Sequence, residues 1–462
     1  MKKTDISTIY KNKDLLGKNL SACGWIKSLR SSKNIGFIDL SDGTSCKTLQ
    51  VIFKDKLENF DKICHLNISS SVSVTGVLVE TPLAKQPFEL LAQTITVNGE
   101  STPDYPLQKK RHSLNYLRTM SHLRCRTNTF SSVFRIRSVA SYGIHKFLQN
   151  EGFNYIHTPI ITESDAEGAG EVFSVTTLNF NDIPKTPEGE VDFSEDFFGK
   201  HAMLTVSGQL QAECMAMALS KVYTFGPTFR AENSNTQRHS AEFWMLEPEI
   251  AFANLNDVIE LSSRLIKYVI NFTLESCKYD LEFLNKTYDE ELISRLEKTI
   301  DEDFKIITYT EAIDLLLKSG HNFEYEIEWG KDLQTEHEKY LSQVVFKNPI
   351  FVIDYPKEIK AFYMRQNDDG KTVAATDMLF PSIGEMIGGS QREERIDVLT
   401  NRIKELKLKE ENYWRYLDLR RYGTIVHSGF GLGFERLIMY LTSLTNIRDV
   451  IPFPRTVKNA EF

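Results

Sequence analysis

The stretch FGPTFRAENSNTQRHSAEFWMLEPE, residues 225–249, holds two strand-like runs on either side of a polar loop. The runs cover 225–232 and 242–250, and the loop is rich in Asn, Ser, Thr and Gln, which predicts a β-hairpin with a long tip. Arg230 and Glu232 lie two residues apart, so a strand would direct both side chains to one face. Taken alone, such a pair is usually a solvated ion pair that contributes little.

The residues around this pair indicate a nucleotide site. Arg238 and His239 lie in the loop, and Phe243 follows on the return strand. Arginine presents fixed donors suited to phosphate oxygens, and a flat aromatic ring gives a base a stacking surface. The hairpin therefore predicts a nucleotide held with its phosphate and its base over one sheet.

Length and composition place the chain among globular proteins. Its 462 residues suffice for two or three domains, and 41% of them are apolar, enough for proper cores. No apolar run reaches the roughly 20 residues that span a bilayer, and the start MKKTDISTIYKNKD lacks the apolar segment of a signal peptide. We therefore expect a soluble, cytoplasmic protein with no membrane segment. The 6 cysteines show no Cys-x-x-Cys pattern, which favours buried free thiols over a zinc site.

The charge is distributed unevenly along the chain. The total of −8 argues against a protein that simply coats nucleic acid. Residues 1–111, however, contain 16 lysines and arginines against 11 aspartates and glutamates, a net charge of +5, which leaves −13 for the rest. A mildly basic segment thus precedes an acidic body, and local positive potential is what a nucleic-acid contact needs.

Residues 19–97 contain five short β runs separated by turns, with a helix expected at 57–64 between the third and the fourth. This spacing predicts a five-stranded barrel of OB type over 1–100, a fold that often binds oligonucleotides on one open face. On that face we expect cations, aromatics and an amide suited to unstacked bases: Trp25, Lys27, Arg30, Phe37 and Gln50. An equally open alternative is that the aromatics belong to the barrel core and the amide is solvated.

The segment 101–126 begins with prolines and a basic cluster, which indicates a linker. Apolar residues then recur with helical spacing over 128–151, and a strand is expected at 152–162, where Pro159 favours a sheet edge or a subunit boundary. Residues 176–199 form an acidic loop expected to be irregular. The remaining expected elements are a capped helix, an inserted helical subdomain and two strands: 207–220, about 253–345, 349–356 and 361–367.

Two carboxylates mark a second group of polar residues. Asp377 and Glu385 flank a strand-turn-strand unit, and Gly388 leaves room for a substrate near the backbone. Two carboxylates beside a phosphate site are the usual way to hold Mg²⁺, which takes one or two protein oxygens and keeps most of its waters. The alternative is two surface acids near a turn. Arg392 closes the segment and indicates an anionic or carbonyl partner.

The sequence HSGFGLGFERLIMYL, residues 427–441, predicts a strand that runs into a helix. Gly429, Gly431 and Gly433 occupy alternate positions of the strand, and Arg436 falls in the first helical turn. Glycines there bare the backbone to a ligand, and a helix N-terminus favours an anion. A dinucleotide fold is not expected, because the chain lacks the alternating βα units which that fold requires.

Three of these stretches carry a family resemblance. TPIITESDAEGAGEVF, FRAEN with RHSAEFWMLE, and GFGLGFERL resemble, in this order, the three signature motifs of class II aminoacyl-tRNA synthetases. With the barrel, nearly the whole chain resembles the subclass that charges asparagine, aspartate or lysine. TVSGQLQAE, GEMIGGSQREER, LDLRRYGTIVHSGFGLGFER and RDVIPFPR are most similar to the bacterial members that charge asparagine. The resemblance implies an α+β fold, with an anticodon-binding barrel and a catalytic domain over 127–462 built on an antiparallel sheet with flanking helices.

The resemblance also implies an activity and its site residues. L-asparagine would react with ATP, assisted by Mg²⁺, to form an adenylate and pyrophosphate, and tRNA(Asn) would then take the acyl group and release AMP. Arg230 and Arg436 would be catalytic and hold the α- and γ-phosphates. The residues implied for ATP are Arg230, Glu232, Arg238, His239, Phe243, Glu385, Gly433 and Arg436. Those implied for the amino acid are Glu167, Ser207, Gln209, Glu213 and Arg392; for the metal, Asp377 and Glu385; for the anticodon, Trp25, Arg30, Phe37 and Gln50.

One departure from the related aspartate enzymes bears on the substrate. Those enzymes carry a lysine that pairs with the substrate carboxylate, where this chain has Ala212 followed by Glu213. Losing a cation and gaining an acid favours the neutral amide. Three alternatives stay open: an aspartyl-tRNA synthetase that charges two tRNAs, a tRNA-independent asparagine synthetase on the same fold, and a non-catalytic nucleic-acid-binding protein. We also expect a two-fold dimer, formed through the strand around Pro159 and the apolar helix before it.

Overall fold

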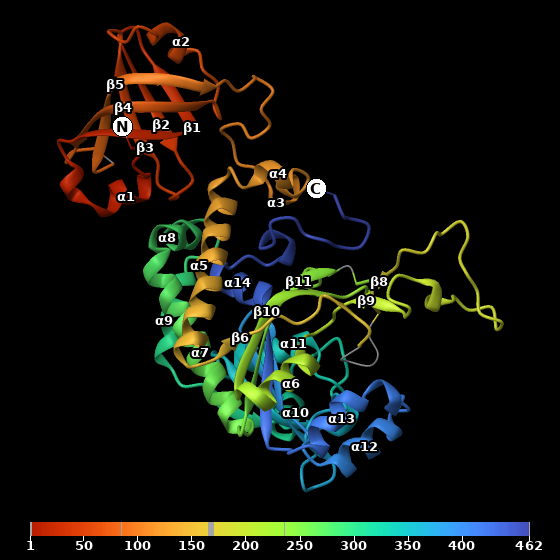
Figure 1. Ribbon diagram of the computed structural model, residues 1–462. Helices are drawn as coiled ribbons and strands as arrows, with labels where there is room; N and C mark the ends of the chain where they lie inside the picture. Colours follow the sequence, from red (N-terminus) through yellow and green to blue (C-terminus); the bar gives the residue numbers. More distant parts are fainter. Residues whose placement is uncertain (1, 85, 165–170, 235, 462) are drawn as a thin grey trace. The chain divides into compact units, whose positions relative to one another are not determined.

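The computed structural model describes residues 2–84, 86–164, 171–234 and 236–461 (Figure 1). The chain divides into two compact units. Unit 1 comprises Met1–Ile136 and Cys277–Glu290, and unit 2 comprises Arg137–Ser276 and Glu291–Glu461. Within the described part of the chain, no helix is long and apolar enough to cross a membrane.

Unit 1 contains a closed five-stranded barrel in the order β1-β2-β3-β5-β4, which confirms the predicted OB-type fold. Its strands are β1 (Asn19–Ser31), β2 (Ile35–Ser41), β3 (Leu49–Lys54), β4 (Ser71–Glu80) and β5 (Phe88–Gly99). Buried and partly exposed residues alternate along β4, as expected of a strand with one face in a core. Val72, Val74 and Val51 belong to that core and are fully buried.

The helices of unit 1 lie before, within and after the barrel sequence. They are α1 (Ile6–Lys11), α2 (Phe60–Cys64), α3 (Leu114–Arg118), α4 (Ser121–Arg124) and α8 (Lys278–Thr287). The predicted helix between the third and fourth strands is confirmed as α2. The segment expected to be a linker thus contains two short helices, and the side chain of Ser113 caps the first of them by accepting from the Tyr116 N–H.

Unit 2 is built on an eight-stranded sheet in the order β12-β13-β14-β15-β16-β11-β10-β6. The strands are β6 (Asn154–Tyr155), β10 (Lys221–Phe229), β11 (Glu242–Ala251), β12 (Lys305–Thr308), β13 (Ile350–Pro356), β14 (Thr372–Phe380), β15 (Gly384–Gln391) and β16 (His427–Gly433). The pairs from β13 to β10 are antiparallel, whereas β12 with β13 and β10 with β6 are parallel. A separate three-stranded sheet consists of β7 (Ile161–Thr162), β9 (Ala202–Leu204) and β8 (Ser174–Val175), in this order.

Helices accompany the large sheet, as the predicted α+β class requires. They are α5 (Asn128–Asn150, which begins in unit 1), α6 (Gln209–Leu219), α7 (Leu255–Ser276), α9 (Leu292–Asp301), α10 (Tyr309–Lys318), α11 (Thr335–Lys339), α12 (Ile396–Glu405), α13 (Trp414–Arg421) and α14 (Phe434–Thr442). Helix α7 packs against β14, β15 and β16. A Cβ atom added to Gly389 would contact Val258 of α7, whereas one added to Gly388 would contact Asp377 and Glu385. Because neighbouring residues of a strand face opposite sides of the sheet, α7 covers the face opposite these two carboxylates.

Three sequence predictions of local structure were wrong. Residues 225–232 do not form one strand: β10 ends at Phe229, because Ala231 leaves the hairpin and donates its N–H to the Glu171 carbonyl. Residues 152–162 form two short strands in different sheets, β6 and β7, rather than one. Residues 361–367 make only isolated bridges, because Phe362 and its neighbour pack into a core with residues of α12 and α13.

The cysteines are free, as predicted, but their burial is mixed. Cys277 is buried, whereas Cys125 and Cys214 are exposed. The prediction of buried thiols was therefore wrong for these two, since Cys125 lies in a turn after α4 and Cys214 on an exposed position of α6.

Candidate active site

Two adjoining cavities lie over the central strands of unit 2. The first has a volume of about 140 Å³ and the second of about 190 Å³. Their linings share Arg230, Met245, Glu385 and Gly431. A ligand of the first cavity would therefore meet a ligand of the second at these residues.

The first cavity gathers every residue predicted for ATP. These are Arg230, Glu232, Arg238, His239, Phe243, Glu385, Gly433 and Arg436. Although Arg230 follows the end of β10, its backbone N–H donates to the Ala241 carbonyl at 3.0 Å, which keeps it beside the return strand. Its guanidinium carbon lies 5.6 Å from the centre of the Phe243 ring. The arginine and the aromatic ring that the hairpin was expected to offer to a nucleotide therefore lie next to each other.

Glu385 and Arg436 meet in the wall between the cavities. Arg436 donates to the backbone carbonyl of Glu385 and to its carboxylate Oε2, the latter at 3.3 Å. The register of β14 and β15 shifts at Met378 and Leu379, and this bulge places Glu385 on the same face as Asp377. Burial raises the pKa of the Glu385 carboxyl, but the positive charges of Arg436 and Lys360 outweigh it, so the net pKa is lowered.

Asp377 lies beside Glu385 and is paired with a lysine that the sequence did not indicate. Lys360 Nζ donates to Asp377 Oδ2 at 2.6 Å. Burial raises the pKa of Asp377, and the charge of Lys360 only partly offsets this. A Cβ on Gly388 would lie 2.9 Å from Glu385 Oε1 and 3.5 Å from Asp377 Oδ1, so the glycine keeps the space between the two carboxylates open.

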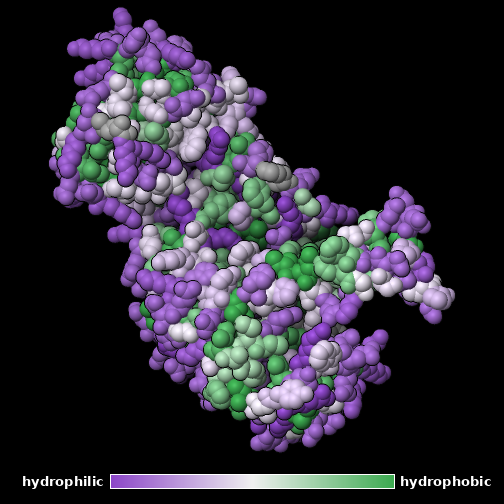
Figure 2. All heavy atoms as spheres, in the orientation of Figure 1, coloured by the Kyte–Doolittle hydropathy of each residue, from purple (hydrophilic) through white to green (hydrophobic). Residues whose placement is uncertain are grey.

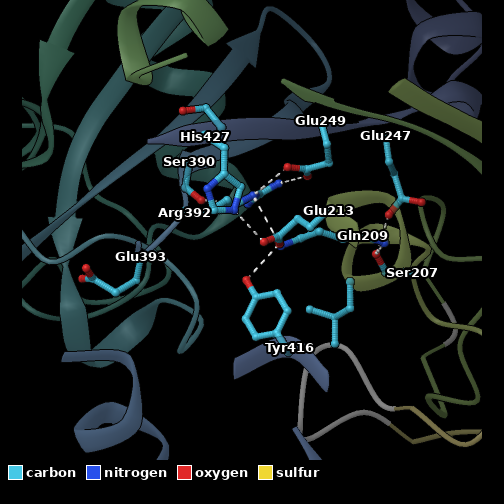
Figure 3. Close-up of polar contacts among 12 residues, drawn as sticks. Ser207, Gln209, Glu213, Glu247, Glu249, Ser390, Arg392, Glu393, Tyr416 and His427 are labelled. Carbon is cyan, nitrogen blue, oxygen red and sulfur yellow. Dashed lines mark hydrogen bonds and ion pairs between the residues drawn. The ribbon is translucent and has the colours of Figure 1, made fainter. Parts of the chain in front are cut away.

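The second cavity is lined by three of the residues predicted for the amino acid, Ser207, Gln209 and Arg392. Arg392 is buried and forms a two-pronged contact with the carboxylate of Glu249, and its Nη1 donates to Ser390 Oγ at 2.8 Å (Figure 3). The positive charge of Arg392 therefore has a dedicated counter-charge. Burial and the neighbouring carboxylate of Glu213 raise the pKa of Glu249 to about 7, although Arg392 lowers it.

Glu213 lies behind Arg392 and does not line the cavity. Its Oε1 accepts from the Tyr416 hydroxyl at 2.9 Å, and its Oε2 accepts from Arg420 at 3.0 Å and lies 2.9 Å from His427 Nε2 (Figure 3). Arg392 Nε lies 3.9 Å from Oε1. Burial raises the pKa of Glu213, but the neighbouring Arg420, His427 and Arg392 lower it by more. The net pKa is therefore lowered, and the carboxylate stays ionised. Its negative charge thus acts on the cavity from behind the arginine.

Several site residues were not predicted from the sequence. Glu247 lines the second cavity and accepts from Ser207 Oγ, from the Gly208 N–H at 3.1 Å and from Thr224 Oγ1 at 3.0 Å. Its spacing of two residues from Glu249 on a strand could have indicated it. Lys360 and Tyr363 also line this cavity, but they lie in an irregular segment without a pattern. The predicted residue Glu167 lies outside the described residues.

The candidate anticodon residues lie on the outside of the barrel, but not around one cavity. Trp25 is 44% exposed, so the core alternative does not hold for it, and Phe37 is half-buried. Trp25 lines a cavity of unit 1 with Arg126, whereas Gln50 lines another and donates to Glu89 Oε1 at 2.6 Å. Arg30 pairs with Phe37 across β1 and β2.

An OB barrel, together with a largely antiparallel sheet that presents Arg230, Arg436, Asp377 and Glu385 at two adjoining cavities, is the arrangement of a class II aminoacyl-tRNA synthetase. Residues 113–457 match the family of class II tRNA synthetases (D, K and N), and the chain belongs to this family. Residues 20–98 match the family described as an OB-fold nucleic acid binding domain.

Similar proteins extend over the whole chain. An asparagine–tRNA ligase of Acetivibrio thermocellus is 61% identical over 464 residues and one of Clostridium tetani is 59% identical over 463, each match covering 100% of both chains. The asparaginyl-tRNA synthetase of Pyrococcus horikoshii complexed with asparaginyl-adenylate is 33% identical, with a TM-score of 0.86 over 99% of this chain and 98% of its own. The enzyme of Entamoeba histolytica, also with asparaginyl-adenylate, is 27% identical with a TM-score of 0.83 over 97% of both chains.

Proposed function

We propose that this chain attaches L-asparagine to tRNA(Asn) in two steps, through an asparaginyl-adenylate formed from ATP. The observation that carries the choice of asparagine is the charge around the second cavity. Arg392 is neutralised by Glu249, Glu213 adds a negative charge behind it, and Ala212 stands where aspartate enzymes have a lysine. Because Glu213 is itself paired with Arg420, both arginines already have a carboxylate partner. A substrate carboxylate would therefore find neither of these arginines unpaired, whereas the amide of asparagine can accept from Arg392 and donate to a carboxylate.

The reaction needs positioning and charge stabilisation more than a protein nucleophile. The substrate carboxylate attacks the α-phosphorus in line, and pyrophosphate leaves. Arg230, at the junction of the cavities, stabilises the charge that develops on the α-phosphate, and Arg436 holds the γ-phosphate. Phe243 stacks on adenine and Glu232 contacts its edge. His239 and His427 have binding or structural roles rather than that of a base.

Asp377 and Glu385 fit a magnesium ion. Their oxygens face a common space at Gly388, and oxygen donors are those that Mg²⁺ prefers. We assign this pair of carboxylates as the donor set for the ion. When bound, the ion would neutralise phosphate charge. Each carboxylate also has a cationic neighbour in the protein: Lys360 contacts Asp377, and Arg436 contacts Glu385.

The barrel is proposed to read the anticodon. Phe37 stacks on the central uridine and Gln50 contacts its edge, with Arg30 and Trp25 as further contacts. Because Gln50 already donates to Glu89, the amide is held in a fixed orientation before tRNA arrives. The chain works in the cytoplasm, where its tRNA is charged.

We also propose a two-fold dimer. Strand β6, which ends at Tyr155, is the edge of the large sheet, and an edge strand can continue into a second copy. Figure 2 shows apolar surface over unit 2 where β6 and α6 lie in Figure 1, and Tyr155, Met215 and Leu219 are exposed on these elements. Sedimentation at micromolar concentration should give a dimer; a fully active monomer would exclude it.

Aminoacylation of tRNA(Asn) and tRNA(Asp) with labelled asparagine and aspartate tests the proposal against its alternatives. We expect ATP-dependent charging of tRNA(Asn) with asparagine alone. Charging of both tRNAs with aspartate would establish a relaxed aspartyl-tRNA synthetase. Release of free asparagine from aspartate and ammonia without tRNA would establish an asparagine synthetase, and inactivity would favour a binding protein.

A further inference from the structure

Glu338 lies on α11, in the predicted helical insertion and outside all three signature motifs. Helix α11 packs against β14 and β15, the strands that carry Asp377 and Glu385. The carboxylate Oε2 of Glu338 accepts a hydrogen bond of 3.0 Å from the backbone N–H of Glu385. A residue of the insertion thus contacts the backbone of a residue that lines both cavities.

Side chains hold the backbone of Glu385 at both its N–H and its C=O. Arg436 donates to its carbonyl oxygen, while Glu338 accepts from its N–H. The strand needs such contacts here, because β15 starts at Gly384 with a φ of +86° and the ladder to β14 shifts register next to it. The regular pairing of strands therefore does not fix the direction of the Glu385 side chain by itself.

The same carboxylate faces a loop arginine of the nucleotide cavity. A Cβ on Gly384 would lie 2.5 Å from Glu338 Oε2 and 3.4 Å from Arg238 Nη1, so both groups converge on this glycine. Arg238 also donates to the Ser382 carbonyl at 3.2 Å. The arginine is thereby held at the rim of the first cavity by the Ser382 carbonyl oxygen, with the Glu338 carboxyl group close by.

We propose that Glu338 is a positioning residue for ATP: it fixes the Glu385 peptide and draws Arg238 to the rim, so that both are in place when the phosphates arrive. Glu338 does not line the first cavity, so it acts through these two residues. The inference rests on the proposed adenylate-forming function and assigns a role to the insertion, which no sequence motif explains.

Two substitutions separate the hydrogen bond from the charge. Glu338→Ala removes both, and Glu338→Gln keeps an acceptor for the Glu385 N–H but removes the negative charge. Hydrogen bonds to charged groups are the stronger ones, so in asparagine-dependent pyrophosphate exchange we expect Glu338→Ala to raise the KM for ATP by about 10-fold or more. The KM for asparagine should change less than about 2-fold, and Glu338→Gln should recover most of the loss.

Glu336 on the same helix provides a matched control. Its carboxylate accepts from the backbone N–H groups of Glu324 and Tyr325, away from the site. Glu336→Ala removes a comparable contact and should leave the KM for ATP unchanged. If Glu336→Ala and Glu338→Ala raised the KM values for ATP and asparagine alike, Glu338 would have only a structural role in α11.

Calorimetric titration with ATP alone separates this inference from the proposed function. The wild-type chain should bind ATP more tightly than Glu338→Ala, whichever amino acid is activated. Equal ATP affinity of the folded Glu338→Ala variant and the wild type would overturn the inference. Absence of asparagine-dependent exchange in the wild type would count against the proposed function instead.

Discussion

Gly429→Ala should damage the amino-acid cavity without a change in any group that contacts a substrate directly. Gly429 pairs with Glu249 across β16 and β11. A Cβ at this position would lie 2.2 Å from Glu249 Oε1 and 2.3 Å from its carboxyl carbon, far inside contact distance. Because Glu249 is fully buried and bonded to Arg392, its carboxylate has little room to retreat.

The structure sets the size of this effect. If the strand shifts to admit the methyl group, overpacking costs about 1–3 kcal/mol. If the carboxylate is pushed away from Arg392, the broken buried ion pair costs about 3–5 kcal/mol. We therefore expect urea unfolding to show that Gly429→Ala lowers the free energy of unfolding by about 1–5 kcal/mol. The KM for asparagine should rise more than the KM for ATP.

Gly431→Ala is the control, because it lies on the same strand and the same face. Its Cβ would lie 2.7 Å from the terminal methyl group of Met245, a flexible side-chain end that can move aside. This variant should lose less than about 1 kcal/mol of stability. Equal stability losses in the two variants, or an unchanged KM for asparagine in Gly429→Ala, would refute the argument.

Three further predictions concern the nucleotide, the tRNA and pH. Arg230→Ala should abolish adenylate formation and leave the unfolding transition unchanged, because a ligand-facing arginine adds little to stability; near-normal pyrophosphate exchange would count against the site. Phe37→Ala should weaken tRNA charging by roughly 5- to 150-fold, since stacking is worth about 1–3 kcal/mol per base, while adenylate formation without tRNA stays normal; an equal loss in both steps would show a core role. Because the pKa of Glu249 is raised to about 7, lowering the pH through that value protonates it and leaves Arg392 without its counter-charge. The ratio of asparagine to aspartate activation should therefore fall at low pH, and a Glu249→Gln variant should show no such dependence.

The barrel and the hairpin followed from local patterns, because side-chain alternation and turn chemistry are encoded in neighbouring residues. The bulge between β14 and β15 could not be predicted from such local patterns. It depends on the register between two strands, which determines that Glu385 faces the same side as Asp377. The end of β10 at Phe229 was also missed, since the chain turns there to pair with Glu171, a residue distant in sequence.

The site could be predicted where its residues stand in motifs. All eight residues predicted for ATP line one cavity. Lys360 and Glu338 were missed, because each contributes a single side chain from an element without a functional pattern. Arg420 was not singled out within the stretch LDLRRYGTIVHSGFGLGFER, although that stretch carries the family resemblance. Their roles arise from contacts to Asp377, to the Glu385 backbone and to Glu213, which only the folded chain brings together.

Amino-acid-dependent exchange of pyrophosphate into ATP tests the central claim most directly, because it isolates adenylate formation from tRNA recognition. Asparagine and aspartate are compared side by side at equal concentration, near pH 8, where Glu249 is ionised and Arg392 is neutralised. The charge arrangement around the second cavity predicts rapid exchange with asparagine and little with aspartate. Exchange with aspartate that equals or exceeds that with asparagine would contradict it.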